Sequence, residues 1–495
     1  MIIMGFLPFS FVENQEYRNH ISLLNKDIVV PSRKKLAAVI DVAYARVRRN
    51  LIAFLNSVDY IALTTDCWTD SVNTRSYLAL TAHYLHGQKL EAIVLGACEF
   101  KANHTSENIS LEIDDILSSW EINRHKIVAV TSDGAANVTN AIVSCFGQNR
   151  HLWCFAHQLN LIVKDSLKSN EYLVRLVTEV KSIVTYFKQS NIASYKLREA
   201  LETNGLRSDL RLKQECQTRW NSTYLMIDRF IQLQIPVSSV CLQLENAPQI
   251  ISRHNVNILQ EVVKLLKPFI KLTEELSAEK TVTVSSVIPM IACLKHIISE
   301  IHPTETVSLN FRTLILKNIA KRFGHVENNE LLSVATLLDA RYKKIDFESP
   351  VAASTAKLII DEKLRAVSAV SIESDDNEQS DSGFWAKHEA NYARSRATTN
   401  TSYDSLRHFL SIKVIDRKSN PIEFWTENSQ SYPDLRSLAL KYLIIPATSV
   451  PCERVFSKAG NLITEKRNRL KPKNVNKMLV LSSLPKRFFD EIDLN

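Results

Sequence analysis

The stretch YIALTTDCWTDSVNTRSYLALTAHYL, residues 60–85, indicates the fold class because the hydrophobic pattern changes there. Before it, residues 1 to about 58 carry apolar side chains at helical spacing, with Ser32 placed to cap the longer helix. Within the stretch, an apolar run ends on Asp66, a polar bend follows, and an alternating run begins at Tyr77. The pattern therefore predicts a helical start followed by a sheet, with a carboxylate at the end of the first strand.

The segments that follow predict three strands, a helix, a strand, a helix and a last short strand, in that order. Gly87 separates the second strand from the third, as a hairpin requires, and Ser106 is the predicted cap of the first helix. The fourth strand is apolar throughout and ends at Asp133, which is typical of a strand buried on both faces and parallel to its neighbour. The three strands of the initial meander are predicted at Tyr60–Thr65, Tyr77–Tyr84 and Leu90–Phe100.

Beyond about residue 175 the strand signals stop and amphipathic helical patterns take over. The segment SIESDDNEQSDS is acidic and polar, so we expect a solvated linker there. The predicted domain order is an N-terminal helical region at 1–58, the first part of the core at 59–175, a helical insertion at 176–370, the acidic linker at 371–382 and a C-terminal helical region at 383–495.

Composition limits the class of protein. The 495 residues are 45% hydrophobic and 23% charged, and the formal net charge is +8, which permits a nucleic-acid partner without requiring one. No run approaches the roughly 18 apolar residues that cross a bilayer, so no membrane partner is expected. The eight cysteines are scattered without a C-x-x-C pair, which favours a reducing compartment.

Two aspartates are predicted at neighbouring strand ends. If the first and fourth strands are parallel neighbours, their backbones lie about 4.8 Å apart and Asp66 faces Asp133. Two such carboxylates repel each other unless a cation lies between them, and a pair of Mg²⁺ ions suits them. The alternative is that each aspartate only forms a turn or caps a helix, which is common after a strand. The spacing of the residues leaves both interpretations open.

Several motifs together resemble the hAT transposase superfamily, in particular the animal branch of BED-zinc-finger proteins derived from such transposases. The resemblance covers residues from about 8 to 485, and its most specific part is the C-terminal motif. It implies a mixed α/β fold with a ribonuclease H-like core, a large all-helical insertion and a helical dimerisation region. The motifs are TTDCWTD at 64–70, VTSDGAANVTNAI at 130–142, WCFAHQLNLIVKD at 153–165, TRWNSTYLMIDR at 218–229 and LKYLIIPATSVPCERVFSKAGNLITEKRNRLKP at 440–472.

The resemblance implies a catalytic site of three acids that hold two divalent ions, Mg²⁺ or Mn²⁺, and cut DNA at transposon ends. Matched by motif, these acids are Asp66, Asp133 and Glu453. Periodicity does not single out Glu453, since an isolated glutamate usually lies on a solvated helix face. All three acids are present in this chain.

The resemblance also implies DNA-binding positions, each with a plainer alternative. The C-x-x-H pair lies near the scissile phosphate in the family, although CLKH at 293–296 repeats its spacing and would allow a zinc centre. The tryptophan of the R-W motif stacks on an extruded base, or else packs in the helical domain. The basic run of the C-terminal segment binds phosphates, or else forms a solvated face. The DNA-binding positions implied are Cys154, His157, Arg219, Trp220, Lys466, Arg467 and Arg469.

Two functions from different classes follow from the resemblance. The first is a nuclear, dimeric, metal-dependent transposase that cleaves and transfers DNA strands. The alternative is a domesticated, non-catalytic nuclear protein that binds DNA or chromatin and dimerises in transcriptional regulation. No cysteine precedes Cys67, so we expect the N-terminal BED finger of this branch to be missing, through either a truncated gene model or loss.

Overall fold

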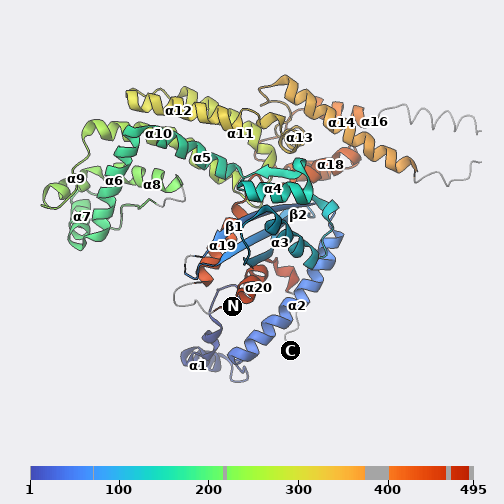
Figure 1. The fold of residues 1–495 in the computed structure, drawn as a ribbon, viewed down its shortest axis with the longest axis horizontal. Helices are drawn as coiled ribbons and strands as arrows, with labels where there is room; N and C mark the ends of the chain where they lie inside the picture. The colour runs from blue at the N-terminus through green and yellow to red at the C-terminus, as the bar shows by residue number, and fades with distance from the viewer. Residues whose placement is uncertain (1, 71, 216–219, 374–400, 464–469, 490–495) are drawn as a thin grey trace, which may run out of the picture.

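The structure is a computed structural model that describes residues 2–70, 72–215, 220–373, 401–463 and 470–489 (Figure 1). Its strands form one five-stranded sheet in the order β3-β2-β1-β4-β5. The first three strands are antiparallel neighbours, whereas β4 is parallel to β1 and β5 is parallel to β4. The mixed α/β fold is thereby confirmed. The strands are β1 (Ile61–Thr69), β2 (Ser76–His86), β3 (Lys89–Phe100), β4 (Ile127–Ser132) and β5 (His151–Trp153).

The first strand is longer than its sequence pattern predicted. β1 continues past Thr65 to Thr69, because residues 66–69 pair in register with residues 76–79 of β2. Asp66 therefore lies inside the strand, and the prediction that the strand ends there is wrong. Main-chain pairing does not depend on side-chain polarity, so a strand continues through polar residues when a partner strand is in register.

The helices occur in the order expected for a core with a long helical insertion. Ser32 caps α2 by accepting a hydrogen bond from Lys35 N at 3.2 Å, whereas Thr105, one residue before the predicted Ser106, caps α3. The described α-helices are α1 (Gln15–Leu24), α2 (Arg33–Ser57), α3 (Ser106–Ser119), α4 (Ala136–Phe146), α5 (Phe155–Lys168), α6 (Glu171–Gln189), α7 (Asn191–Thr203), α8 (Trp220–Gln232), α9 (Gln234–Leu242), α10 (Arg253–Leu276), α11 (Val287–Glu300), α12 (Thr306–Phe323), α13 (Glu330–Leu338), α14 (Pro350–Glu373), α16 (Thr401–Ser411), α17 (Pro421–Glu427), α18 (Pro433–Leu443), α19 (Val450–Leu462) and α20 (Pro472–Ser483).

Two hydrophobic cores divide these elements. The sheet core combines α2, the sheet, α3, α4, α19 and α20. The helical core combines α5 to α14 with α16, α17, α18 and four buried sheet residues, Ala62, Val128, Ala129 and Leu152, and Figure 1 shows this helical body extending across one side of the sheet. Of the described α-helices after α4, α19 and α20 belong to the sheet core, although they follow β4 by more than 300 residues in sequence.

The two returning helices bind the sheet in different ways. Helix α20 covers the edge strand β3, where Asn476 accepts a hydrogen bond from Ala97 N at 2.9 Å and Ser483 accepts one from Val94 N at 2.9 Å. These side chains satisfy edge amides that would otherwise be open to pairing. Helix α19 packs against β1 and β2, which places it beside Asp66.

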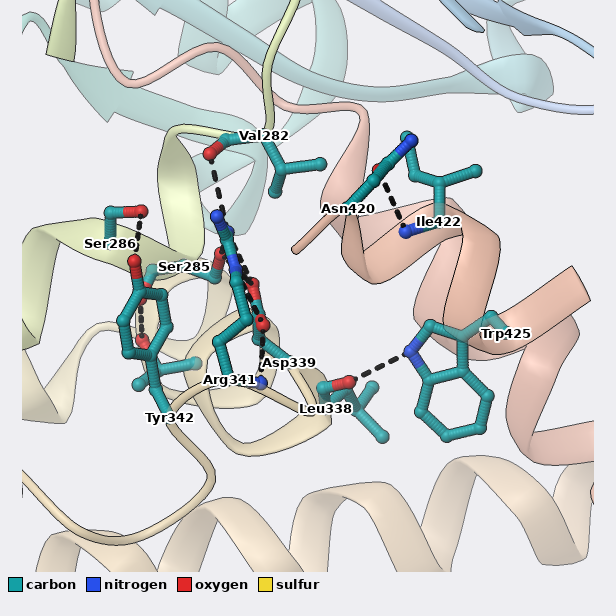
Figure 2. Close-up of polar contacts among 11 residues, drawn as sticks. Val282, Ser285, Ser286, Leu338, Asp339, Arg341, Tyr342, Asn420, Ile422 and Trp425 are labelled. Atoms are coloured by element: carbon teal, nitrogen blue, oxygen red, sulfur yellow. Dashed lines mark hydrogen bonds and ion pairs between the residues drawn. The ribbon is translucent and has the colours of Figure 1, made fainter. Parts of the chain in front are cut away.

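A buried ion pair organises the turn after α13, as Figure 2 shows. The Arg341 guanidinium donates to both carboxylate oxygens of Asp339, at 2.7 Å and 3.0 Å, and the Asp339 side chain is fully buried. Ser285 donates to the same carboxylate at 2.6 Å from the short 3-10 helix η4 (Val284–Ser286). Trp425 of α17 donates to the Leu338 carbonyl at 2.9 Å. This last hydrogen bond joins α13 to α17. Of the acidic linker predicted at 371–382, residues 371–373 belong to the end of α14 and the rest lies outside the described residues.

Among the described residues no single helix has the length and apolar character needed to cross a membrane, although the bent pair Asn221–Gln232 and Gln234–Leu242 passes that test by length and composition together.

Candidate active site

The sheet brings Asp66 and Asp133 together on one face. The last paired residues of β1 and β4 are Thr64 and Thr131, and each aspartate lies two residues further along its own strand direction. Because side chains alternate along a strand, each aspartate shares a face with the threonine two residues before it. Asp66 is half-buried inside β1, and Asp133 is half-buried in the turn after β4.

The turn at Asp133 satisfies its backbone locally. Asp133 Oδ1 accepts a hydrogen bond from Ala135 N at 3.1 Å, and Gly134 adopts a positive φ of 85° that favours glycine. The turn-forming role considered from sequence is therefore real for Asp133, and it leaves the second carboxylate oxygen for another partner. Asp66 Oδ1 accepts from Cys67 N at 2.8 Å, within the strand.

The third acid reaches the site because the segment before α19 docks onto the sheet and α5. Thr131 donates to the Pro446 carbonyl at 2.8 Å, and Phe155 N donates to the Ala447 carbonyl at 3.0 Å. Ser449 N donates to Cys154 Sγ at 3.3 Å. With residues 446–449 fixed in this way, Glu453 lies in the first turn of α19 with an exposed side chain.

The three acids line one cavity of about 930 Å³ between the sheet and the helical body. An aromatic wall stands beside them, where the Trp68 and Phe456 rings stack at 5.7 Å between centroids. The opposite wall comes from the helical body. It consists of His157 and Asn160 of α5, Asn221 of α8, and Thr273, Glu274 and Ser277 at the end of α10.

The electrostatics of the cavity centre on Asp66. Burial raises its pKa, and the neighbouring Asp133 and Glu453 carboxylates raise it further, to about 8. The hydrogen bond from Cys67 N opposes this shift. A carboxyl held among other carboxylates in this way keeps its proton at neutral pH unless a cation enters. The three acids thus influence one another in the folded chain, although they come from separate elements.

The donor set fits a hard divalent cation in its chemistry, since carboxylate oxygens are the ligands that Mg²⁺ and Mn²⁺ prefer. Among the residues that the structure describes, however, no three His, Cys, Asp or Glu side chains are grouped so that they could hold a metal ion. The three acids share the cavity without forming a closed ligand set. The same finding means that Cys154, His157, Cys293 and His296 do not form the alternative zinc centre.

The two members of the C-x-x-H pair occupy different environments. Cys154 is fully buried, and its thiol accepts the hydrogen bond from Ser449 that anchors the segment before α19. Burial raises the pKa of this thiol, so it remains protonated and acts as a structural group. His157, one turn further along α5, lines the cavity. Of this pair, His157 faces the space that a substrate would occupy.

The other DNA-binding positions inferred from the sequence fall at gaps in the described chain. Arg219, Lys466, Arg467 and Arg469 lie outside the described residues, and Trp220 is described only as the first residue of α8.

Sequence reasoning missed the cavity wall formed by the helical body. Asn160 follows His157 by three residues, so the helical period offered a signal for it. The residues at the end of α10 carried no such signal.

Comparisons with known proteins identify the chain's relatives. Residues 64–175 match the ZBED1 RNase-like domain, residues 152–265 match the ZBED1 RNase-like helical domain, and residues 405–484 match the hAT family C-terminal dimerisation region. The last match supports self-association of the chain.

Similar proteins include both BED zinc finger proteins and transposases. Zinc finger BED domain-containing protein 4 of Homo sapiens is 23% identical over 99% of this chain and 43% of its own length. The putative AC transposase of Zea mays is 24% identical over 95% of this chain and 62% of its own length. The Hobo transposase of Drosophila melanogaster is 23% identical over 79% and 65%, respectively. The chain thus spans 43 to 65% of the length of these relatives, and it belongs to the hAT family of transposases and transposase-derived proteins.

Proposed function

We propose that the chain is a DNA-cleaving and strand-transferring enzyme of the hAT type, with Asp66, Asp133 and Glu453 as its catalytic acids. The observation that carries this proposal is that three carboxylates from distant parts of the chain line one cavity, where two of them raise the pKa of the third. A merely structural role does not require acids to be held against their mutual repulsion. The retained acids favour this function over the domesticated, non-catalytic role.

In the proposed mechanism these three acids hold divalent cations, Mg²⁺ or Mn²⁺. When bound, the cations supply charge neutralisation at the scissile phosphate and activation of the attacking oxygen. Glu453, in the first turn of α19, lines the same cavity as Asp66 and Asp133 and raises the pKa of Asp66, which supports its place as the third acid. The acids alone would repel a DNA phosphate, which makes cation binding and DNA binding interdependent.

The helical body offers polar groups to the DNA strand. Within the described chain, Asn221 Oδ1 and Ser277 Oγ are buried without a hydrogen-bond partner, and both residues line the cavity. Such atoms need a partner, and the hydrogen-bonding groups of a nucleotide can supply one. His157 lies on the same wall. We place the DNA strand between this wall and the acids.

An enzyme that acts on chromosomal DNA must reach the nucleus, so we propose a nuclear location for the protein. Microscopy of a fluorescent fusion in cells tests this location.

The metal proposal is tested by stability measurements at several pH values. The pKa of Asp66 is about 8 in the folded chain and near its ordinary value of 3.8 when unfolded, so the folded state binds the extra proton between these values. This carboxyl therefore stabilises the fold most below pH 4, and that contribution is lost as the pH rises to 8. At pH 8 the parent must ionise a half-buried carboxyl that lies among other carboxylates, and Asp66→Asn removes this cost. The unfolding free energy of the variant should therefore exceed that of the parent at pH 8, by on the order of 2 kcal/mol.

The same stability measurements, repeated with Mn²⁺, test whether the cation binds at Asp66. Thermal unfolding is followed at pH 5 and pH 8, with and without Mn²⁺, for the parent, Asp66→Asn and the exposed control Asp27→Asn. We expect Mn²⁺ to raise the melting temperature of the parent and of the control at pH 8, and to leave Asp66→Asn unchanged. Equal Mn²⁺ shifts in all three proteins would show that the ion does not bind at Asp66.

The dimerisation region predicts that the purified chain self-associates. Light scattering of the full chain should give a mass of at least twice 56.3 kDa at micromolar concentration. The intact chain is required, because a version ending near residue 420 would lose α19 and α20, which complete the sheet core. A mass equal to one chain at every concentration tested would refute self-association through residues 405–484.

A further inference from the structure

A buried polar cluster lies directly behind the acids, at the contact between the sheet and α19. Thr64 comes from β1, Thr81 and His83 from β2, and Cys452 from α19, and none is more than 5% exposed. Thr64 Oγ1 lies 3.2 Å from Cys452 Sγ and also hydrogen-bonds Thr81 Oγ1. Thr81 Oγ1 in turn lies 3.0 Å from His83 Nε2. Four polar side chains thus form one connected network inside the sheet core.

This network calls for an explanation, because its neighbours in the sheet core are apolar and hydrocarbon side chains could fill the same space. Replacing both partners of a buried hydrogen bond by apolar groups of the same shape can be nearly neutral or stabilising, so an apolar contact could hold α19 about as firmly. Hydrogen bonds differ from apolar contacts in being directional, and they select one rotation and one height of a helix on a sheet. The network therefore fixes the orientation of α19 on the sheet.

The residues of the network are close in sequence to two of the candidate acids. Thr64 precedes Asp66 by two residues on the same face of β1, and Cys452 immediately precedes Glu453. The contact between Thr64 and Cys452 accordingly joins the strand that carries one acid to the helix that carries another.

We propose that the Thr64–Thr81–His83–Cys452 network is a positioning device that sets the first turn of α19 so that Glu453 faces Asp66. This inference rests on the proposed function and deepens it. Thr64 and Cys452 are its two positioning residues, because their contact is the one that crosses between strand and helix. Thr81 and His83 hold the Thr64 hydroxyl in place from β2.

Two further features agree with this role. Burial lowers the pKa of His83 to about 3, so the imidazole is neutral at physiological pH and adds no charge behind the acids. On the opposite, exposed side of α19, Arg454 donates to the Ser277 carbonyl at 3.0 Å and forms an ion pair with Glu279. The first turn of the helix is therefore held from the sheet on one side and from the end of α10 on the other.

The test uses the full chain with Thr64→Val, Cys452→Ala and the conservative Cys452→Ser, which keeps a hydrogen-bonding group. Thr178→Val on the surface of α6 and Cys241→Ala in the helical core are matched controls. Two readouts are taken, the kcat and KM of metal-dependent DNA nicking, and the hydrogen exchange of the amides at 454–457. These amides donate to carbonyls of the first turn of α19, so they report its order.

We expect Thr64→Val and Cys452→Ala to lower kcat about 10- to 100-fold with KM nearly unchanged, since a misplacement of about 1 Å has such an effect. Their amides at 454–457 should exchange faster, Cys452→Ser should restore much of both properties, and the controls should match the parent. Normal kcat and exchange in Thr64→Val and Cys452→Ala would overturn the positioning role while leaving the proposed function intact. A parent that does not nick DNA would refute the proposed function, and unchanged exchange would then separately refute the network's hold on α19.

Discussion

Asp66→Asn and Glu453→Gln should each abolish DNA nicking, lowering its rate by at least about 10³-fold in Mg²⁺ or Mn²⁺. Both changes replace a carboxyl group with a neutral amide of the same shape. The assay uses DNA that carries the genomic sequences on both sides of the coding sequence. The reason for the large effect is that acids acting as one unit around a scissile phosphate do not compensate for one another.

The controls for this assay are Asp27→Asn and Glu179→Gln, which make the same chemical changes at exposed positions far from the cavity. They should nick at the rate of the parent. Because Asp66→Asn is expected to be the more stable protein at pH 8, its loss of activity cannot be attributed to unfolding. Equal background nicking in the parent and both site variants would favour the non-catalytic, DNA-binding role.

The second large effect is on stability. Arg341→Met leaves the fully buried Asp339 carboxylate without its cation, which should cost about 3–5 kcal/mol of unfolding free energy. Chemical denaturation of the parent and the variant measures the difference. The matched control is Arg207→Met, which breaks an ion pair with Asp209 whose side chains are 78% and 64% exposed, and which should leave the unfolding free energy nearly unchanged.

A double variant separates the ion pair from the space that it fills. Replacing both partners, as Arg341→Met with Asp339→Leu, should recover a large part of the loss, because no unpaired charge then remains buried. A double variant as unstable as Arg341→Met alone would mean that the hydrogen bonds to Ser285 matter more than the charge.

This ion pair also has a connection to the candidate site. It holds the segment that contains Thr283, whose side chain accepts a hydrogen bond from Ala447 N at 3.0 Å. Ala447 belongs to the segment that leads into α19 and Glu453. The helical body therefore supports the third acid from behind, as well as lining the far wall of the cavity.

The sheet could be predicted from local pattern, which also drew attention to two of the three candidate acids. Strand periodicity located the meander and the buried fourth strand, and the predicted strand ends pointed to Asp66 and Asp133 while leaving a turn-forming role open for each. The true length of β1 could not be predicted in this way, because pairing with β2 extends the strand through polar residues. Local patterns report side-chain burial, whereas strand ends are also set by the partner strand.

Glu453 could be found only through resemblance to a family. It occupies an exposed position in an ordinary amphipathic helix, and its importance arises from a return of the chain across more than 300 residues. Periodicity within a window cannot detect such long-range contacts. The buried network of Thr64, Thr81, His83 and Cys452 was missed for the same reason, since its hydroxyl, imidazole and thiol groups meet only in the folded chain.

The most direct test of the account is a crystal of the chain grown with Mn²⁺ and measured for anomalous scattering. The account predicts Mn²⁺ peaks bounded by the carboxylates of Asp66, Asp133 and Glu453, and weaker or absent peaks in crystals of Glu453→Gln. Mn²⁺ peaks located elsewhere, or none at these acids in crystals soaked at millimolar Mn²⁺, would contradict the claim that the three carboxylates form one metal-binding site.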